Sequence, residues 1–511
     1  MSDRMPPDDQ TAVVDFLSDP ATHGGAPVER IDTHAAMVFL VESRAYKLKR
    51  AVRYPYLDFS TRGRRRAACD AELRLNRRTA PAIYEAVVDV VRRADGGLAL
   101  GGPGEVLDAV LVMRRFDSNG LFDRLAVGRR LTHDHMRALA DHIAAFHAAA
   151  EPCRGGGASS MRIIVAQNLE EMRGQAGLLD PRTVDRLARR SAEELDRLAP
   201  LIEARAAAGF VRHGHGDLHL ANIVLLDGQP TLFDCLEFDD ALATVDVLYD
   251  LAFLLMDLEH RGLRPLANTA FNRYVDKGCG LEGLALLPLF LSVRASIRAK
   301  IAAAAARLQP DDSAAAIKRA EAGAYLELAR ALLEPPLPQL MAVGGLSGSG
   351  KSTVARALAP DTGAAPGALV LRSDVIRKTL FGVSPETALP EDAYTPAVTE
   401  RVYATIVQRA TVALEAGHSV IADAVFARAE ERDAIAAAAG RCGVPFTGLW
   451  LTAPATARAG RIGGRGPDAS DATAAVAIRQ ESYDLGPMAW RRIDADQSVQ
   501  AVLRCAREAL P

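Results

Sequence analysis

The first 120 residues alternate short apolar runs with charged and turn-forming positions, a pattern typical of β-strands. The runs at 36–41 and 45–49 are separated by Glu-Ser-Arg and predict a hairpin. A helix is expected from about 62 to 78, and two further strands are expected near 86–92 and 109–116. The N-terminal part of the chain therefore predicts a small, sheet-rich lobe.

The stretch from 132 to 333 predicts mostly helices. Two short apolar runs interrupt it, at 223–226 and 231–233, on either side of an Asp-Gly pair that favours a tight turn. The expected layout of this part of the chain is a small sheet-rich lobe followed by a large helical lobe.

The last third of the chain alternates apolar strand-like runs with helical segments. Four strands are expected, at 340–344, 368–371, 419–422 and 447–451. This alternation predicts a parallel sheet between layers of helices, an α/β sandwich. Three prolines, at positions 335, 336 and 338, cannot continue the preceding helix. We therefore predict two domains, 1–335 and 339–511.

Composition narrows the class of protein. The 511 residues are 49% hydrophobic and 24% charged, with a net charge of −3, which fits a globular chain and disfavours a protein dedicated to nucleic acid. No apolar run reaches the roughly 20 residues that a membrane helix needs. The six cysteines form no C-x-x-C pair, and the first ten residues do not resemble a secretory signal. We expect a cytoplasmic protein, and its oligomeric state stays open.

The strongest local signal is a phosphate-binding loop between the strand and the helix expected after residue 340. The sequence from Gly345 to Ser352 reads G-L-S-G-S-G-K-S and satisfies G-x-x-x-x-G-K-[ST]. Backbone amides of such a loop surround a triphosphate, the lysine reaches the β- and γ-phosphates, and the hydroxyl of the serine binds Mg²⁺. The residues expected to contact ATP here are Gly345, Gly348, Ser349, Gly350, Lys351, Ser352 and Thr353.

This region resembles the small P-loop kinases, a group that includes gluconate-type, polynucleotide-type and zeta-toxin-like kinases. The resemblance implies that Asp374 and Arg377, in a D-x-x-R pattern, act as the base for the acceptor hydroxyl and as a contact for its anionic groups. Capping of a helix is the alternative role for Asp374. Asp423, at the end of a strand, would help to hold Mg²⁺, and its alternative role is that of a capping residue. The arginine-rich segment 458–465 resembles the lid of these kinases, in which an arginine closes over the transferred phosphoryl group. Which of its arginines is catalytic stays open, and Arg461 is the one that we assign to the nucleotide.

A second constellation lies near residue 215. His215-Gly-Asp217-Leu-His-Leu-Ala-Asn222 has the H-x-D-x-x-x-x-N spacing of a kinase catalytic loop, and Asp234 follows after the small hairpin. In this chemistry one carboxylate orients the acceptor hydroxyl, and an amide oxygen and a second carboxylate hold magnesium. The predicted roles are catalytic for Asp217 and metal-binding for Asn222 and Asp234.

These residues resemble those of the aminoglycoside phosphotransferase-like family, whose members phosphorylate many small hydroxyl compounds. The resemblance implies a bilobal protein-kinase-like fold in which Lys47 contacts the ATP phosphates and pairs with Glu72. Lys49 is the alternative, and strand alternation leads us to favour Lys47. Met113 would lie at the adenine hinge. The chain departs from protein kinases because no G-x-G-x-x-G precedes the hairpin, so the phosphate loop would be 33–36.

The leading hypothesis is a bifunctional kinase with two ATP and Mg²⁺ sites, each acting on a hydroxyl of a small molecule such as a sugar or aminosugar. Two alternatives stay open: one domain is a nucleotide-sensing regulator of the other, or the P-loop domain is a nucleic-acid end kinase. A zinc site is a further reading of Asp217 with the histidines of its loop, but their spacing is not that of a helical zinc site. Neither acceptor can be named from the sequence.

Overall fold

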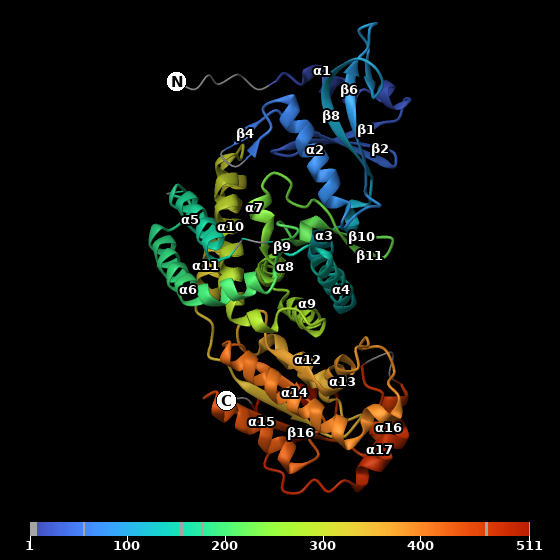
Figure 1. Cartoon of the computed structure of the whole chain (residues 1–511), viewed down its shortest axis with the longest axis vertical. Coiled ribbons are helices and arrows are strands. Elements are labelled where there is room, and N and C mark those ends of the chain that lie inside the picture. Colours follow the sequence, from blue (N-terminus) through green and yellow to red (C-terminus); the bar gives the residue numbers. More distant parts are fainter. Residues whose placement is uncertain are drawn as a thin grey trace. The chain divides into compact units, whose positions relative to one another are not determined.

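The computed structural model describes residues 8–54, 57–153, 155, 157–175, 177–464 and 469–509. The chain divides into two compact units, and Figure 1 labels the helices and strands along it. The first unit contains residues 1–156 and 206–254, and the second contains residues 157–205 and 255–511. The domain boundary expected between residues 335 and 339 lies inside the second unit, and it stays a prediction.

A six-stranded antiparallel sheet forms the N-terminal part of the first unit. In spatial order its strands are β1 (Val28–Asp32), β2 (Ala36–Val41), β3 (Arg44–Lys49), β8 (Glu105–Arg114), β6 (Tyr84–Arg92) and β7 (Leu98–Leu100). Leu48 packs on one face with Val13 and Leu17 of helix α1 (Thr11–Ser18). Ala45, three residues before Leu48 in β3, packs on the opposite face with Cys69 of helix α2 (Arg62–Asn76). Strand alternation therefore turns every second residue of β3 toward α2.

The rest of the first unit is mainly helical with two small sheets. Its helices are α3 (Phe122–Val127), α4 (His133–Ala149), α7 (Asp240–Ala243) and the start of α8 (Val247–His260). Its sheets pair β9 (Val211–His213) with β12 (Thr244–Asp246), and β10 (Ile223–Leu226) with β11 (Gln229–Leu232). Asp227 and Gly228, at φ 50° and 80°, join β10 to β11. Two left-handed residues form the turn that suits a twisted hairpin, as the Asp-Gly pair predicted.

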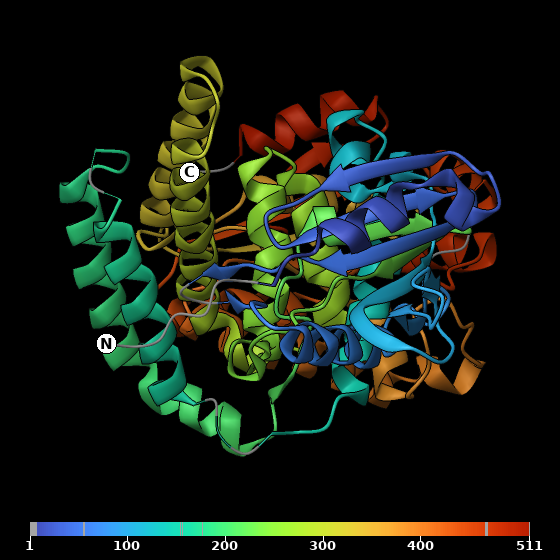
Figure 2. The same cartoon turned by 90° about the horizontal axis from the view of Figure 1, so that it is seen from above.

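Long helices make up the first part of the second unit. They are α5 (Ala158–Arg173), α6 (Pro181–Ala207), α9 (Arg264–Asp276), α10 (Leu287–Arg307) and α11 (Asp312–Leu332). Helices α10 and α11 pack along each other over much of their length (Figure 2, olive ribbons). Among the described residues, no helix combines the length and the apolar composition needed to cross a membrane.

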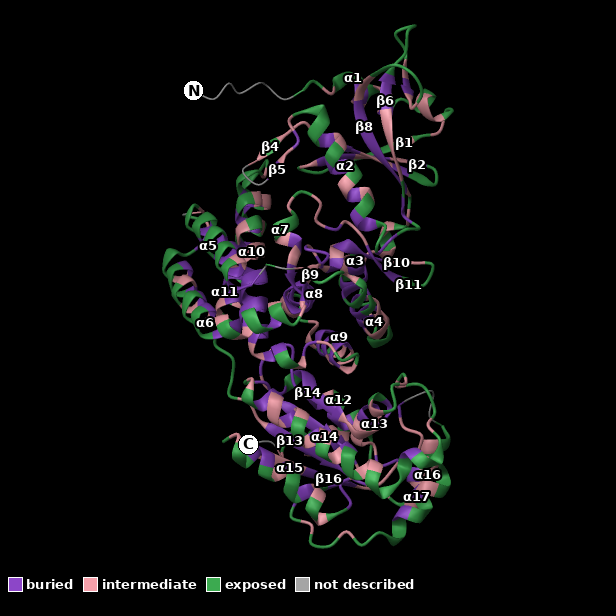
Figure 3. Cartoon of the chain, in the orientation of Figure 1, coloured by how far each residue is buried: buried purple, intermediate pink, exposed green. Residues whose placement is uncertain are grey.

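A five-stranded, fully parallel sheet organises the C-terminal part of the second unit. In spatial order its strands are β14 (Leu369–Arg372), β15 (Val420–Asp423), β13 (Leu340–Gly344), β16 (Phe446–Thr452) and β17 (Arg491–Asp494). Its helices are α12 (Lys351–Leu358), α13 (Ser373–Leu380), α14 (Pro396–Glu415), α15 (Ala429–Arg441), α16 (Ala455–Gly463), α17 (Ala474–Arg479) and α18 (Val499–Arg507). The central strands are buried on both faces (Figure 3), which is why they read as unbroken apolar runs.

The expected fold class is confirmed: a kinase-like α+β fold is followed by a parallel α/β sandwich of the P-loop type. Strands β1 and β17 were not predicted, because most of their residues are exposed and charged residues break the apolar pattern. Shorter elements also escaped prediction. They are α1, β4 (Arg53–Tyr54), β5 (Leu57–Asp58), β7, β9, β12 and the 3₁₀ turns η1 (Pro20–His23), η2 (Ser118–Gly120), η3 (Leu220–Asn222), η4 (Leu281–Leu286), η5 (Ala359–Asp361), η6 (Glu391–Tyr394) and η7 (Gln480–Ser482).

Candidate active sites

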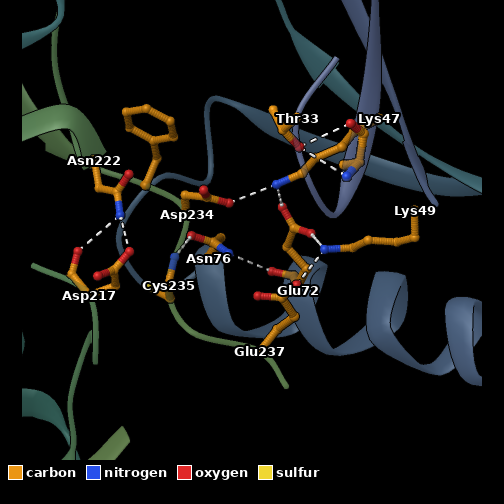
Figure 4. A network of polar contacts seen from close by, with 12 residues as sticks. Thr33, Lys47, Lys49, Glu72, Asn76, Asp217, Asn222, Asp234, Cys235 and Glu237 are labelled. Carbon is orange, nitrogen blue, oxygen red and sulfur yellow. Dashed lines mark hydrogen bonds and ion pairs between the residues drawn. The ribbon is translucent and has the colours of Figure 1, made fainter. Parts of the chain in front are cut away.

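In the first unit, Lys47, Glu72, Asp217, Asn222 and Asp234 form what we call the first candidate site (Figure 4). Lys47 Nζ donates to Glu72 Oε1 at 2.8 Å and to Asp234 Oδ1 at 2.7 Å. The structure thus joins residues 25 and 187 positions apart in the chain. Burial lowers the pKa of Lys47, but Asp234 and Glu72 outweigh it and hold the pKa well above the ordinary value. Lys47 is therefore a fixed cation.

A second lysine shares the same carboxylate. Lys49 Nζ lies 2.5 Å from Glu72 Oε2 and also donates to Glu237 Oε1. Burial disfavours its charge, yet Glu72 and Glu237 raise the pKa of Lys49 to about 12. The choice of Lys47 over Lys49 on strand alternation overlooked that residues two apart in a strand share a face. Both lysines face α2, and Glu72, which is fully buried, bridges them.

Within the catalytic loop, Asn222 orients Asp217. The amide nitrogen of Asn222 donates to the Oδ2 atom of Asp217 at 2.9 Å and to its main-chain oxygen at 2.9 Å. His219 Nε2 lies 3.4 Å from the same Oδ2 atom. With its nitrogen committed to Asp217, Asn222 keeps its amide oxygen as the atom that can ligate a cation. The order of groups along the loop is the one that the spacing predicted.

Asp250, which the sequence did not single out as functional, holds the backbone of this loop. Its carboxylate accepts from the main-chain N–H groups of His215 at 2.7 Å and Gly216 at 2.9 Å, and lies 3.1 Å from His147 Nε2. His215 is fully buried, and its Nε2 lies 3.0 Å from the Phe233 oxygen. Burial lowers the pKa of His215, but Cys235, Asp250 and Asp217 raise it to about 9. The two histidines and Asp250 form the support beneath Asp217.

Asp234 has a left-handed backbone, at φ 60°, which is uncommon for a residue with a side chain. Two side chains on other elements hold it there: the Tyr84 hydroxyl accepts from the Asp234 N–H at 3.0 Å, and Asn76 Oδ1 accepts from the Cys235 N–H at 2.8 Å. Although burial raises the pKa of Asp234, Lys47 lowers it below its ordinary value. The carboxylate is thus ionised and directed toward Lys47.

The remaining features of the first candidate site frame the nucleotide region. Thr33 closes the turn before β2, since its Oγ1 accepts from the Ala36 N–H at 2.9 Å and donates to the Ala36 oxygen at 2.9 Å. Met113 is buried near the end of β8 and pairs in register with Ala45 and Tyr84. Carboxylate and amide oxygens from Asn222 and Asp234 are the donors that Mg²⁺ prefers, so these residues fit the ion.

In the second unit, the loop Gly345–Ser352 joins β13 to α12 and forms, with Asp374 and Asp423, the second candidate site. Gly345, Gly348 and Gly350 have φ values of 140°, 83° and 94°. At Gly345 an added Cβ would lie 2.6 Å from the Leu451 oxygen, and at Gly348 it would lie 2.5 Å from the Arg458 oxygen. The glycines are therefore required both by the left-handed turn and by the close approach of neighbouring backbone.

The polar residues of the loop lie where helix α12 begins. Lys351 Nζ donates to the Leu346 oxygen at 3.2 Å, across the loop. Ser349 is buried and its N–H donates to the same oxygen at 3.1 Å, while Ser352 is half-buried and Thr353 is exposed. A loop of this shape, with its lysine folded across it at a helix N-terminus, fits a triphosphate, and the Ser352 hydroxyl with the Asp423 carboxylate fits Mg²⁺.

Asp374 and Asp423 lie near each other at the carboxyl ends of neighbouring strands. Asp423 ends β15, is buried, and lies with its Oδ2 3.5 Å from Arg372 Nε. Asp374 is in the first turn of α13. Burial raises the pKa of Asp374, and Arg372, Asp423 and Lys351 all act on it electrostatically. The fold therefore gathers the predicted base, the predicted metal ligand and the P-loop lysine.

Arg377 is more buried than its predicted role suggested. Its guanidinium donates to the Ala393 oxygen at 2.7 Å and to Thr399 Oγ1 at 3.3 Å, and lies 4.9 Å from the centre of the Tyr394 ring. Burial lowers its pKa, while Asp374 raises it. Arg377 thus supports the loop beside Asp374, and its contact with an acceptor stays a prediction.

The arginine-rich segment separates into two roles. Arg458 is buried and donates to the main-chain oxygens of Ser347 at 3.1 Å and Ala453 at 3.2 Å, so it ties α16 to the P-loop. Arg461 is partly exposed, and its Nη2 donates to the Ala495 oxygen at 2.7 Å, at the end of β17. Arg465 lies outside the described residues. The contact of Arg461 with nucleotide stays a prediction.

Two family models match the chain: one described as a phosphotransferase enzyme family over residues 37–285, and one described as an AAA domain over residues 340–483. An uncharacterized protein of Mycobacterium tuberculosis and one of Mycobacterium bovis are each 30% identical over 469 residues, covering 89% of this chain and 90% of theirs. The similarity thus extends along nearly the whole length of both this chain and these relatives.

Among solved structures, a gluconokinase from Sinorhizobium meliloti covers 34% of this chain and 94% of its own, with 24% identity and a TM-score of 0.24. A choline/ethanolamine kinase family protein from Mesorhizobium loti covers 63% of this chain and 98% of its own, with 14% identity and a TM-score of 0.38.

The two matched models define the class of the chain, a phosphotransferase with kinase-like domains. The chain belongs to the same family as the mycobacterial relatives, and within it residues 37–285 match the phosphotransferase enzyme family and residues 340–483 match the AAA domain.

Proposed function

We propose that the protein is a bifunctional kinase with two separate sites, each transferring the γ-phosphoryl group of ATP to a hydroxyl of a small molecule. One observation carries this proposal: each unit, taken by itself, contains a lysine, a candidate base and candidate metal ligands. In the first unit these are Lys47, Asp217 and the pair Asn222 and Asp234. In the second they are Lys351, Asp374 and the pair Ser352 and Asp423.

In the first site, Asp217 accepts or orients the acceptor hydroxyl, since Asn222 fixes the position of its carboxylate. Lys47, held by Glu72, binds the phosphates of ATP. Asn222 and Asp234 would hold Mg²⁺, which would neutralise charge on the phosphates. For Lys47 to reach the phosphates, its bond to Asp234 has to give way, and the Glu72 bond keeps the ammonium in place meanwhile.

In the second site, the loop Gly345–Ser352 binds the triphosphate through main-chain N–H groups and Lys351. Asp374 takes the role of the base toward the acceptor, and burial raises the pKa of its carboxyl group, which makes it a stronger proton acceptor. Arg461 contributes a cation from α16. The domains that carry these sites are 1–335 and 339–511.

The test uses full-length Asp217→Asn, Lys351→Ala and the double variant, with ATP consumption measured against a library of sugars, aminosugars and nucleosides. We expect each single variant to lose turnover with its own subset of acceptors by about 10²- to 10⁴-fold, and the double variant to lose all of it. If either single variant abolishes turnover with every acceptor, one site regulates the other and the bifunctional proposal is wrong. Turnover of a 5′-hydroxyl oligonucleotide that Lys351→Ala removes would instead identify an end kinase.

A further inference from the structure

Helix α9 lies within residues 37–285, the span matched by the phosphotransferase family model, yet it pairs with the edge of the parallel sheet. Asn272 Oδ1 accepts from the Val370 N–H at 2.7 Å, and Asn272 Nδ2 lies 3.2 Å from the Ala368 oxygen. Asn268 Nδ2 donates to that oxygen at 3.0 Å. A side-chain amide offers the donor and the acceptor of a peptide group, so α9 occupies the place of a sixth strand beside β14.

Further contacts fix the helix along the same border. The rings of Phe271 and His418 lie 5.1 Å apart, Arg264 donates to the Gly363 oxygen at 2.9 Å, and Arg273 Nη1 lies 3.0 Å from Glu386 Oε1. Gly367 has φ 105°, and an added Cβ there would lie 2.4 Å from the Ala359 oxygen and 2.9 Å from Asn268 Nδ2. The backbone before β14 thus lies close both to the preceding 3₁₀ turn and to α9.

The border leads directly to the second candidate site through Arg372, the last residue of β14. Arg372 lies 3.5 Å from the Asp423 carboxylate. Arg372 also interacts electrostatically with Asp276, the last residue of α9, and with Asp374. The guanidinium at the end of β14 is therefore coupled both to the end of α9 and to the acids of the P-loop site.

We propose that α9 positions the magnesium end of the P-loop site: Asn272 fixes β14, and Asp276 orients Arg372, which holds the Asp423 carboxylate. Asn272, Asp276 and Arg372 are positioning residues, because they act on the nucleotide through Asp423. The inference rests on the proposed function, in which Asp423 is a ligand of Mg²⁺. It also means that a helix assigned to the phosphotransferase half completes the site of the other half.

The experiment measures binding of a fluorescent N-methylanthraniloyl ATP to the full chain, with Mg²⁺ and with EDTA. The component of binding that Lys351→Ala removes is taken as the P-loop component. Asn272→Ala and Asp276→Asn are compared with wild type and with Asp312→Asn, a matched change at an exposed carboxylate at the start of α11. Asp276→Asn alters none of the hydrogen bonds between Asn272 and β14. It therefore tests the role of α9 in nucleotide binding even if Asn272→Ala impairs folding.

We expect both α9 variants to reduce the gain in affinity that Mg²⁺ gives to the P-loop component by about 10- to 100-fold, with affinity in EDTA unchanged. Asp312→Asn should match wild type. Equal losses with Mg²⁺ and with EDTA would show a merely structural role and overturn the inference, as would a Mg²⁺ gain that stays at the wild-type level. If Lys351→Ala removes no component at all, the proposed function itself fails, and the inference fails with it.

Discussion

The two candidate sites hold their phosphate-binding groups in different ways. In the first, side chains from distant parts of the chain fix one another: Lys47 is bonded to Glu72 and Asp234, and Asp250 supports the loop of Asp217. In the second, eight consecutive residues build the loop, and the backbone geometry of its glycines does most of the shaping. The first site therefore depends on the pairing of buried lysines with buried carboxylates. The second depends on glycines, at positions of the loop where a side chain would not fit.

The largest effect is expected where the charge balance of the first site is broken. Lys49 is 2% exposed, and Lys49→Met leaves Glu237 without its ammonium partner and Glu72 with only Lys47. Because an unpaired buried carboxylate is costly, we expect urea unfolding to show a loss of about 3–5 kcal/mol. In the double variant Lys49→Met/Glu237→Gln, part of this loss should return. A double variant as unstable as the sum of the singles would show that the two side chains do not act as a pair.

A smaller loss is expected at the support of the catalytic loop. Asp250→Ala removes a carboxylate that accepts two main-chain N–H bonds in a fully buried position, so we expect a loss of about 3 kcal/mol in the free energy of unfolding. Amide hydrogen exchange at 215–217 should also accelerate. The control is Asp239→Ala, since Asp239 also accepts two main-chain N–H bonds but caps an α7 turn near the surface. Asp239→Ala should lower the free energy of unfolding by only about 1 kcal/mol. Equal losses at both positions would contradict the support role of Asp250.

The glycines of the second site offer a matched pair. Gly348→Ala and Gly350→Ala both place a Cβ on a left-handed backbone, at a cost of about 1–2 kcal/mol. Only at Gly348 does the Cβ meet another backbone, the Arg458 oxygen at 2.5 Å; at Gly350 no described atom lies within 4 Å. Thermal and urea unfolding should show Gly348→Ala as the less stable by a further 1–3 kcal/mol, roughly the cost of overpacking. Equal stabilities of the two variants would mean that the backbone at Arg458 shifts to make room for the Cβ at no measurable cost.

The smallest effect concerns pH at the end of α9. Burial raises the pKa of Asp276 from 3.8 to about 7, against the opposing influence of Arg372, Arg273, Arg409 and Lys277. Because the folded chain holds this proton more tightly than the unfolded chain, the contribution of Asp276 to stability is complete below about pH 4 and is lost as the pH rises through 7.

Melting temperatures of wild type and Asp276→Asn, measured from pH 4 to pH 8.5, check this sign. The stability of wild type relative to the variant should fall from pH 4 to about pH 7 and then level off. A relative stability that rises with pH would mean that the arginines dominate and that Asp276 is ionised throughout. The Asp312→Asn variant, at an exposed carboxylate, should give a flat difference over this range.

The comparison of the two sites also explains what the sequence could predict. The P-loop was predicted because all of its groups lie in one segment, and the roles of Lys47 and Glu72 came from a family resemblance. The supports were missed because they are remote: Tyr84 and Asn76 contact the residues around Asp234 from about 150 positions away. Asp250 was indistinguishable from a helix cap in a run of acids. The pairing of Lys49 with Glu237 could have been found, since Lys47 and Lys49 share a strand face.

The pairing of α9 with β14 had little signal in the sequence. By pattern, Asn272 and Asn268 are ordinary helix residues. Their partner is the edge of a strand about 100 positions later, which no other described strand of the sheet covers. Gly367 was the one available hint, because a glycine just before a predicted strand can mark a close backbone approach.

Arg458 has a mechanical consequence. Its guanidinium donates both to the Ser347 oxygen in the phosphate loop and to the Ala453 oxygen just before its own helix. The N-terminal end of α16 is therefore tied to the loop and cannot move away without breaking these hydrogen bonds or displacing the loop. We therefore expect any movement of α16 that admits a nucleotide to occur beyond this anchor, toward the end of the helix at Gly463 and Gly464.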